Sequence, residues 1–436
     1  MTSIALIVFA ITYALIASEK VHRVAAALGG VAAMAILGLF REEGPLVSAD
    51  TAFFSEHTGV DWGVIFLLFG MMIVVSVLRH TGLFEFIALW AARVSKGSPV
   101  RLLIVLMSVT ALFSPILDNV TVVLLVAPVT LSVCQRLSIS PMPYLMGLIF
   151  AANIGGTSTL IGDPPNLIIA SRADLSFTDF LVYSLPLTLL LFVVLVLVLI
   201  VVFRKQMHKK IDVDEALGDL DPKDAIPSVA LLVRCLIVLA IVMVTFGMHE
   251  FVPLDPSIVA MLGAGFMVLV SQTKPKQFLA EVEWTTLAFF MSLFVLVGVL
   301  VEVGVIGQMG EFAAELMDGN ELGGVTGLLF GSAIIGAVVD NIPYTTAMVN
   351  IVAEMVAATP HVGADSPLWW AFVFGADLGG NMTAVAAGAN VVVLGLAASA
   401  GEKISFWKFA KYGIPITLLT VAISWVYIYV RFFVFG

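Results

Sequence analysis

The 436-residue sequence is poor in charged residues and almost free of cysteine. Only 12% of its residues are charged and 60% are hydrophobic, whereas about a quarter of the residues of a soluble domain carry charge. Together with a mean hydropathy of +1.08, this composition excludes a soluble globular protein and indicates a polytopic membrane protein. The net charge is −10 and no basic face occurs outside short loops, so nucleic acid is not an expected partner.

The sequence also lacks the motifs of several enzyme classes. No Walker motif, Gly-x-Ser-x-Gly or His-Glu-x-x-His string occurs, which argues against ATP hydrolysis and against hydrolytic chemistry in the membrane. The two cysteines, Cys134 and Cys235, lie beside apolar segments, and we expect two buried, reduced thiols there. The chain is therefore expected to be neither an enzyme nor a cofactor-binding protein.

Four short motifs of the first half return in the second half in the same order. Asp118-Asn119 returns as Asp340-Asn341 and Asp61-Trp62 as Glu283-Trp284, both after 222 residues (340 − 118 and 283 − 61). Asn153-Ile-Gly-Gly-Thr157 returns as Asp377-Leu-Gly-Gly-Asn381 after 224 residues (377 − 153), and Ser176-Phe177 returns as Ser405-Phe406. A chain built twice from one unit, with acidic and amide residues inside apolar sequence, is typical of membrane transporters.

The apolar segments divide evenly between the two halves. A bilayer-spanning helix needs about 20 apolar residues, and we predict ten such spans: 4–18, 23–40, 62–79, 143–170, 179–203, 229–247, 254–271, 284–301, 367–397 and 411–433. Extra apolar sequence at 99–136 and 323–357 is interrupted by Asp-Asn, which indicates a re-entrant hairpin in each half. A short amphipathic stretch, 83–96 or 305–318, precedes each hairpin and is expected at the membrane interface.

The positions of Lys and Arg test this topology. With the N-terminus outside, 18 of the 21 Lys and Arg fall on the inside, and only Arg41, Arg172 and Arg431 fall outside. Five spans in each half then make the repeat an inverted one. We therefore predict an all-α polytopic membrane protein, an inverted repeat of 5+5 transmembrane helices with two re-entrant hairpins and two broken helices. Both termini are expected on the extracytoplasmic side of the plasma (inner) membrane.

The fourth span of each half cannot be one unbroken helix. Glycines and prolines crowd the segment from Asn153 to Asn166, which reads NIGGTSTLIGDPPN, and the matching segment from Asp377 to Asn390 is also rich in glycine. Non-helical backbone at membrane depth persists only where it is buried in protein or lines a wet cavity. We therefore expect the hairpin tips and these loops to meet at one pseudo-symmetric site.

Four acidic residues are expected at membrane depth: Asp118, Asp163, Asp340 and Asp377. No Lys or Arg lies near them in sequence, so we expect carboxylates without basic partners that hold protons or cations. Helix capping is the alternative, and it is strongest for the two aspartates at the hairpin tips. The candidate substrate- and ion-binding residues are Asp118, Asn119, Thr121, Asn153, Thr157, Ser158, Asp163, Asn166, Asp340, Asn341, Asp377, Asn381, Thr383 and Asn390. A sodium site would use the same residues.

The string Leu117-Asp-Asn-Val-Thr121 and the segment 153–166 closely resemble the ion transporter superfamily. Its arsenite permeases of the ArsB type, the P protein and the NhaD sodium/proton antiporters are the most similar members, and sodium-coupled dicarboxylate transporters are more distant. Those transporters carry Ser-Asn-Thr at both tips, whereas this chain has an added Asp at each, which argues against a di- or tricarboxylate substrate.

The resemblance implies an elevator motion and a homodimer, with an ATPase subunit as a further partner, as in arsenical pumps. It divides the chain into a scaffold (1–97 and 229–304) and a transport part, joined by a cytoplasmic linker at 204–228. The transport part comprises 98–203, with hairpin 99–136 and broken helix 143–170, and 305–436, with an interfacial helix, hairpin 323–357 and broken helix 367–397.

The expected function is proton-coupled efflux of arsenite or antimonite. Neutral As(OH)3 is rich in hydroxyl groups, which amide and hydroxyl side chains can bind. Two cysteines are too few for three-thiolate arsenic coordination. Sodium/proton antiport of the NhaD type and a P-protein-like anion transporter or channel stay open as alternatives, because the same carboxylates and loop carbonyls would serve sodium.

Overall fold

The computed structural model describes residues 2–18, 20–39, 45, 47–55, 58–207, 221–248, 254–317 and 319–435. All regular elements in these residues are helices, which confirms the prediction of an all-α polytopic membrane protein. Most of the expected cytoplasmic linker, residues 208–220, lies outside the described residues.

The first half begins with three helices, α1 (Thr2–Ser18), α2 (Arg23–Gly38) and α3 (Trp62–Arg79), followed by the amphipathic α4 (Leu83–Val94). Hairpin 1 consists of α5 (Pro99–Leu117) and α6 (Asn119–Arg136), and the broken helix of α7 (Met142–Gly156) and α8 (Pro164–Ala173). After α9 (Phe177–Asp179), a π-helical turn (Phe180–Ser184) leads into α10 (Leu185–Phe203). The prolines at 164 and 165 occupy the first turn of α8, where their missing N–H groups cost nothing.

The second half follows the same order. It contains α12 (Val229–Gly247), α13 (Pro256–Ser271), α14 (Pro275–Ala280), α15 (Trp284–Glu302) and the amphipathic α16 (Val305–Met317). Hairpin 2 consists of α17 (Glu321–Val339) and α18 (Asn341–Ala357), and the broken helix of α19 (Pro367–Gly379) and α20 (Gly388–Ser399). The last helix, α21 (Phe406–Ile428), ends in a π-helical segment (Tyr429–Val434). The short α14 and the π-helical geometry of three segments, Asp50–Phe54, Phe180–Ser184 and Tyr429–Val434, were not among the sequence predictions.

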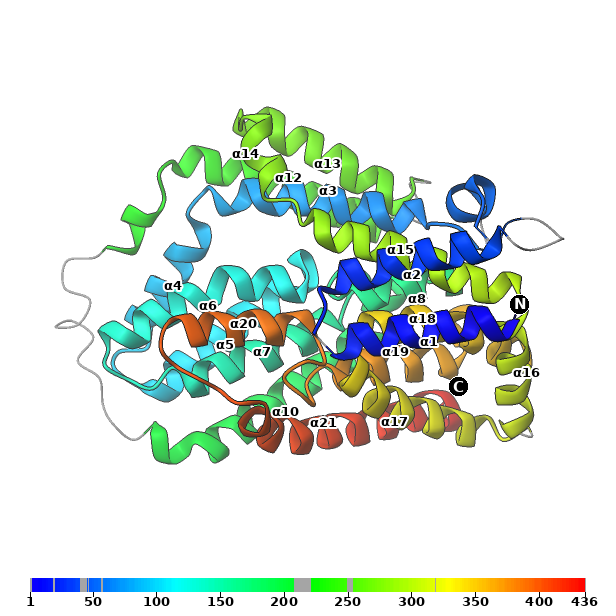
Figure 1. Cartoon of the computed structure of the whole chain (residues 1–436). Coiled ribbons are helices and arrows are strands. Elements are labelled where there is room, and N and C mark those ends of the chain that lie inside the picture. The colour runs from blue at the N-terminus through cyan, green and yellow to red at the C-terminus, as the bar shows by residue number, and fades with distance from the viewer. Residues whose placement is uncertain are drawn as a thin grey trace.

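Helix length alone does not separate spans from hairpin arms. Eight helical segments of the described chain are long and apolar enough to cross a membrane, and three of them are the hairpin arms α5, α6 and α17. Figure 1 shows that α5 and α6 enter from one end of the molecule and α17 and α18 from the opposite end, with both tips near the middle. The two hairpins are therefore opposed, as the inverted repeat requires.

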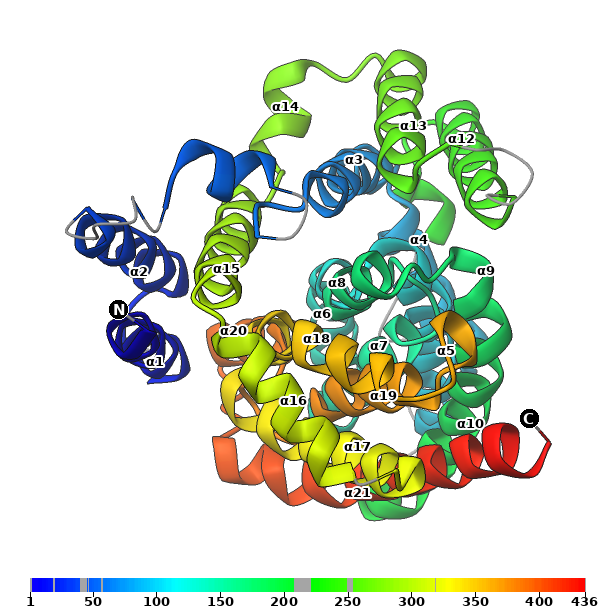
Figure 2. The same cartoon turned by 90° about the vertical axis from the view of Figure 1, so that its right-hand side faces the viewer.

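The helices form two groups, which Figure 2 shows end-on. Helices α1, α2, α3, α12, α13 and α15 lie along one side, and the hairpins, the broken helices, α10 and α21 form the other group. The assignment of these groups as a scaffold part and a transport part stays a prediction, and so does the movement of one group against the other.

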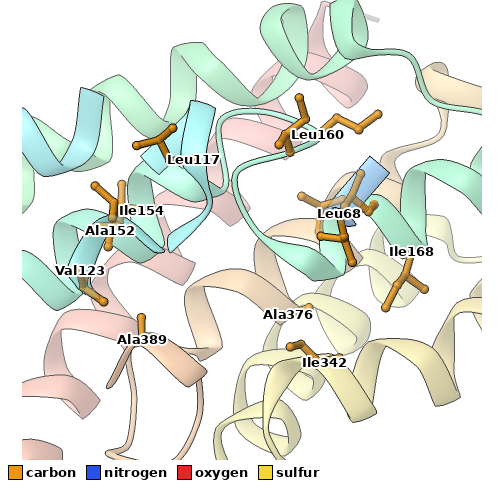
Figure 3. Packing of buried hydrophobic residues seen from close by; sticks show 14 of the residues in the cluster. Leu68, Leu117, Val123, Ala152, Ile154, Leu160, Ile168, Ile342, Ala376 and Ala389 are labelled. Atoms are coloured by element: carbon orange, nitrogen blue, oxygen red, sulfur yellow. The ribbon is translucent and has the colours of Figure 1, made fainter. Parts of the chain in front are cut away.

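Glycine allows the hairpins to pack tightly against the broken helices. A Cβ atom on Gly155 of α7 would lie 2.8 Å from the backbone oxygen of Ala111 in α5. A Cβ atom on Gly379 of α19 would lie 2.8 Å from the backbone of Ala333 in α17. The repeated Gly-Gly motif thus has a packing role in both halves. Figure 3 shows the buried apolar residues around the same region, among them Leu117.

Candidate functional site

The aspartates at the two hairpin tips are helix caps. Asp118 and Asp340 both adopt positive φ angles, 71° and 85°, between the arms of their hairpins. Asp118 Oδ1 accepts a hydrogen bond from the Thr121 backbone N–H at 2.7 Å, and Asp340 Oδ1 accepts one from the Ile342 N–H at 3.1 Å. These contacts confirm the capping alternative for both residues, and each satisfies a backbone donor that membrane depth would leave unpaired.

The asparagines beside them connect the hairpins to the centre. The backbone N–H of Asn119 donates to Gly162 O at 3.0 Å, and that of Asn341 donates to Ala386 O at 3.1 Å. Each tip therefore rests on the loop of the broken helix in its own repeat. The side chains of both asparagines reach Asp163: Asn119 Nδ2 donates to Oδ2 at 2.7 Å, and Asn341 Nδ2 to Oδ1 at 3.5 Å. Asp163 thus contacts both hairpin tips.

Asn153 joins the two repeats. Its Nδ2 donates to Asn381 Oδ1 at 2.9 Å and to Asn390 Oδ1 at 3.2 Å, both in the second repeat. Its Oδ1 accepts from Asn119 Nδ2 at 3.1 Å. Asn153, Asn381 and Asn390 are fully buried. The structure therefore brings residues of both loops and both tips into one polar centre.

Two of the candidate asparagines also hold their own loops closed. Asn166 Nδ2 donates to Gly156 O at 3.2 Å and to Thr159 O at 2.9 Å. Asn390 Nδ2 makes the matching bonds to two loop carbonyls of the second repeat, at 2.6 and 2.8 Å. Because the carbonyls of an interrupted helix lose their intrahelical partners, these amides replace the missing donors.

The hydroxyl groups among the candidates bond to nearby protein acceptors. Thr157 Oγ1 donates to Asn153 O at 2.9 Å, and Ser158 Oγ donates to a backbone carbonyl one turn earlier at 2.6 Å. Thr121 Oγ1 donates to the carboxylate of its own hairpin tip at 2.7 Å, and Thr383 Oγ1 to Ala337 O at 2.6 Å. The protons of these hydroxyls are committed to the fold, and their lone pairs remain available to a bound solute.

Asp377 differs from every other acidic residue of the centre. It is fully buried, and both of its carboxylate oxygens lack a hydrogen-bond partner among the described residues. Thr157 and Asn166 are near it, but their donors go to backbone carbonyls. Its carboxylate is also the charge that acts most strongly on Asp163. An ionised, unpaired carboxylate at such a position costs several kcal/mol.

One carboxylate of the four does have a basic partner. Arg23 Nη1 lies 3.8 Å from Asp340 Oδ2, with side-chain exposures of 38% and 17%. The prediction that none of these aspartates has a basic partner is therefore wrong for Asp340. Arg23 begins α2, far from Asp340 in sequence, and only the fold brings them together. Sequence reasoning placed Arg23 at a cytoplasmic span end and gave no signal for this contact.

Two cavities flank the site. One of about 420 Å³ is lined by Arg23, Glu283 and Asp340 together with apolar residues of α1 and α20. The other, of about 680 Å³, lies among α3, α8, α12 and α13, and its polar lining includes Asp61 and Asp174. No group of three or more His, Cys, Asp or Glu in the described parts of the chain could hold a metal ion. The two cysteines are free and buried, as predicted.

Two opposed hairpins that meet a buried polar centre between broken helices define a secondary membrane transporter. The protein belongs to the citrate transporter family, CitMHS, whose model matches residues 13–375. This assignment confirms the resemblance to the ion transporter superfamily.

Several relatives match this chain over its full length. The chain is 48% identical over 438 residues to an uncharacterized transporter of Mycobacterium tuberculosis and 46% identical over 434 residues to a 46 kDa membrane protein of Mycobacterium leprae, with 100% of each chain covered. It is 31% identical over 513 residues to the P protein of Homo sapiens, covering 100% of this chain and 60% of that protein. Transport is thus the activity named among its relatives.

Two solved structures share the fold. The YdaH transporter of Alcanivorax borkumensis matches with a TM-score of 0.60 at 14% identity, covering 93% of this chain and 96% of that one. MtrF of Neisseria gonorrhoeae, described among antimetabolite efflux pumps, matches with a TM-score of 0.62 at 11% identity, covering 98% of both chains. At such low identity, these matches describe the architecture alone.

Proposed function

We propose that this protein exports a small neutral solute, arsenite or antimonite, in exchange for protons, and that Asp377 carries the coupling proton. The observation behind the proposal is the Asp377 carboxylate, fully buried with no hydrogen-bond partner in the described chain and next to Asp163. Two carboxylates in a dry centre repel each other, so at least one favours the neutral form. A proton that binds in one conformation and leaves in another would couple transport to the proton gradient.

The chemistry of the centre supports a neutral, hydroxyl-bearing solute. Asn119 Oδ1 and Asn381 Nδ2 are buried and unpartnered among the described residues, so they can accept from and donate to As–OH groups. Cys134 lies in α6 and Cys235 in α12, and neither thiol belongs to the polar centre. A neutral solute also avoids repulsion by the two carboxylates.

Arsenite resistance tests the proposal in cells. Cells without their own arsenite pumps should gain resistance when they express this chain, and no gain despite verified membrane insertion would refute arsenite export. In proteoliposomes, a pH gradient should drive arsenite accumulation by the wild type. Asp377→Asn should abolish the gradient dependence, whereas Asp174→Asn, at a carboxylate in the peripheral cavity, should retain it.

Citrate is the second substrate to test, because the family model carries that name. The centre contains two carboxylates, and Arg23 is a basic residue that contacts the hairpin tip at its edge. Free citrate would therefore meet repulsion that protons or a divalent cation must offset. Assays of arsenite, sodium, citrate and citrate with magnesium in the same proteoliposomes separate these functions. Sodium-dependent pH change without arsenite would favour a sodium/proton antiporter, and uncoupled current would favour an anion pathway.

Movement of the transport group against the scaffold would carry the centre across the membrane, with a homodimer formed by the scaffold in the plasma membrane. Specific polar contacts between the two groups include Arg23–Asp340, Tyr13 OH to Pro343 O at 3.0 Å, and Ser171 with Asp61. Movement of one group against the other would have to break these directional contacts.

A further inference from the structure

The scaffold contacts the tip of hairpin 2 through a cation. The Arg23 guanidinium lies 5.3 Å from the centroid of the Phe289 ring on α15, which fixes it to the scaffold by a cation–π contact. From this position its Nη1 reaches Asp340 at 3.8 Å. Tyr13 of α1 donates to Pro343 O, two residues past the Asn341 start of α18. Two scaffold helices therefore contact the same hairpin tip.

The tip of hairpin 1 has a different electrostatic environment. Asp118 occupies the position that matches Asp340, and the charged groups that act on it include Glu283, at the start of α15, and Asp163. Glu283 lines the same 420 Å³ cavity as Arg23 and Asp340. In this conformation the scaffold presents a cation to Asp340, whereas no ion pair to Asp118 occurs among the described residues.

We propose that Arg23 is a positioning residue, which holds the tip of hairpin 2 against α2 in this conformation and releases it during transport. The proposal rests on the proposed function in one respect, because it assumes that the two helix groups move. The contact itself does not depend on the identity of the substrate. Asp340 has two roles in this arrangement: one oxygen caps α18, and the other faces Arg23.

Hydrogen exchange in lipid nanodiscs tests the contact directly. We expect Arg23→Gln to speed exchange in residues 338–344 by about two- to fivefold, the range for a partly exposed ion pair. Exchange in residues 116–122, at the tip of hairpin 1, should not change and serves as an internal control. Arg23→Lys keeps the charge and should stay within about twofold of the wild type. Equal acceleration at both tips would show general loosening and would overturn the proposal, as would no acceleration at hairpin 2.

A double-mutant cycle separates the ion pair from the cap. Asp340→Asn weakens both roles of that residue, and Asp118→Asn is the matched control because it changes a cap without a described arginine contact. Arg23→Gln should add little to Asp340→Asn at hairpin 2, since the pair is already lost. Its effect should remain complete in the Asp118→Asn background. Full additivity with Asp340→Asn would overturn the pairing.

Transport kinetics give the functional readout. Arg23 lies outside the polar centre, so Arg23→Gln should change the maximal rate of arsenite exchange several-fold while KM stays within about twofold, as for a residue that acts on the conformational step. A large change in KM with an unchanged maximal rate would overturn the positioning role. If arsenite is not transported by the wild type, the proposed substrate fails, and the hydrogen-exchange results still decide the role of Arg23.

Discussion

Asp163 and Asp377 should respond oppositely to the same conservative change. With the proton on Asp377, as proposed, Asp163 is the ionised carboxylate, and it accepts a charge-assisted hydrogen bond from Asn119 at 2.7 Å and a weak one from Asn341 at 3.5 Å. Asp163→Asn would replace one of the two acceptor oxygens with an NH2 group, although Asn119 and Asn341 both donate to this side chain. The bond from Asn119 contributes about 1.5–3 kcal/mol, and the longer bond from Asn341 contributes little. Asp163 makes no capping bond to α8, so the loss is confined to the hairpin contacts.

The same change at Asp377 removes no hydrogen bond, because its carboxylate has no partner among the described residues. It also prevents Asp377 from ionising beside Asp163, where two charges would repel each other. An entropy of unfolding of about 2.1 cal/mol/K per residue makes 1.5–3 kcal/mol equal to about 2–3 °C for a chain of this length. We therefore expect Asp163→Asn to lower Tm by about 2–3 °C and Asp377→Asn to leave it equal or higher.

A thiol-reactive dye measures this difference without added labels. Cys134 and Cys235 are free and 0% exposed, so they react only when the protein opens. Unfolding of a membrane protein is often irreversible, so all variants need the same heating rate. If Asp377→Asn lowers Tm as much as Asp163→Asn does, the Asp377 carboxylate has a stabilising partner and the reasoning for proton binding fails.

The remaining predictions concern packing and loop closure. Gly155→Ala should destabilise the protein by about 1–3 kcal/mol, because its Cβ would lie 2.8 Å from a backbone oxygen of α5, and a lower Tm checks this. The matched control, Gly265→Ala on α13, meets no atom within 4 Å and should keep or raise Tm. Asn390→Leu leaves two loop carbonyls unpaired, each costing about 1–3 kcal/mol, so the yield of folded protein should drop in size-exclusion chromatography. Thr383→Val removes one hydroxyl donor and should cost about 1 kcal/mol in the same Tm assay.

Much of this architecture follows from local sequence features. Gly155, Gly156 and Pro164 mark a break that no continuous helix tolerates, and α7 ends and α8 begins where they predict. The Asp-Asn pairs mark the hairpin tips because a cap with positive φ favours Asp or Asn over bulkier residues. The opposed orientation followed from the positions of Lys and Arg. Helix breakers and caps are local features, and the distribution of Lys and Arg is a statistical one. Neither kind of feature depends on tertiary contacts.

The contacts that sequence reasoning missed depend on the tertiary fold. In the sequence, Arg23 is a basic residue at the end of a predicted span. Its contact with Asp340 forms only because the fold brings α2 beside hairpin 2. The short α14 follows a polar segment with a single proline signal at Pro275. The hydrogen bonds of Asn166 to carbonyls of its own loop were not predictable either. An asparagine in a polar loop can serve solute binding as well as loop closure.

The pattern of matches between the repeats separates structural residues from those proposed for chemistry. Asn166 and Asn390 match and make the same bonds, and the two tip aspartates match and make similar caps. Asp377 stands where the first repeat has Asn153, and Asp163 where the second repeat has alanine. Matched residues make the same contacts in both halves, because both halves need the same local fold. A centre formed once, where the halves meet, needs each carboxylate only once, and the two unmatched aspartates are the pair whose charges interact there.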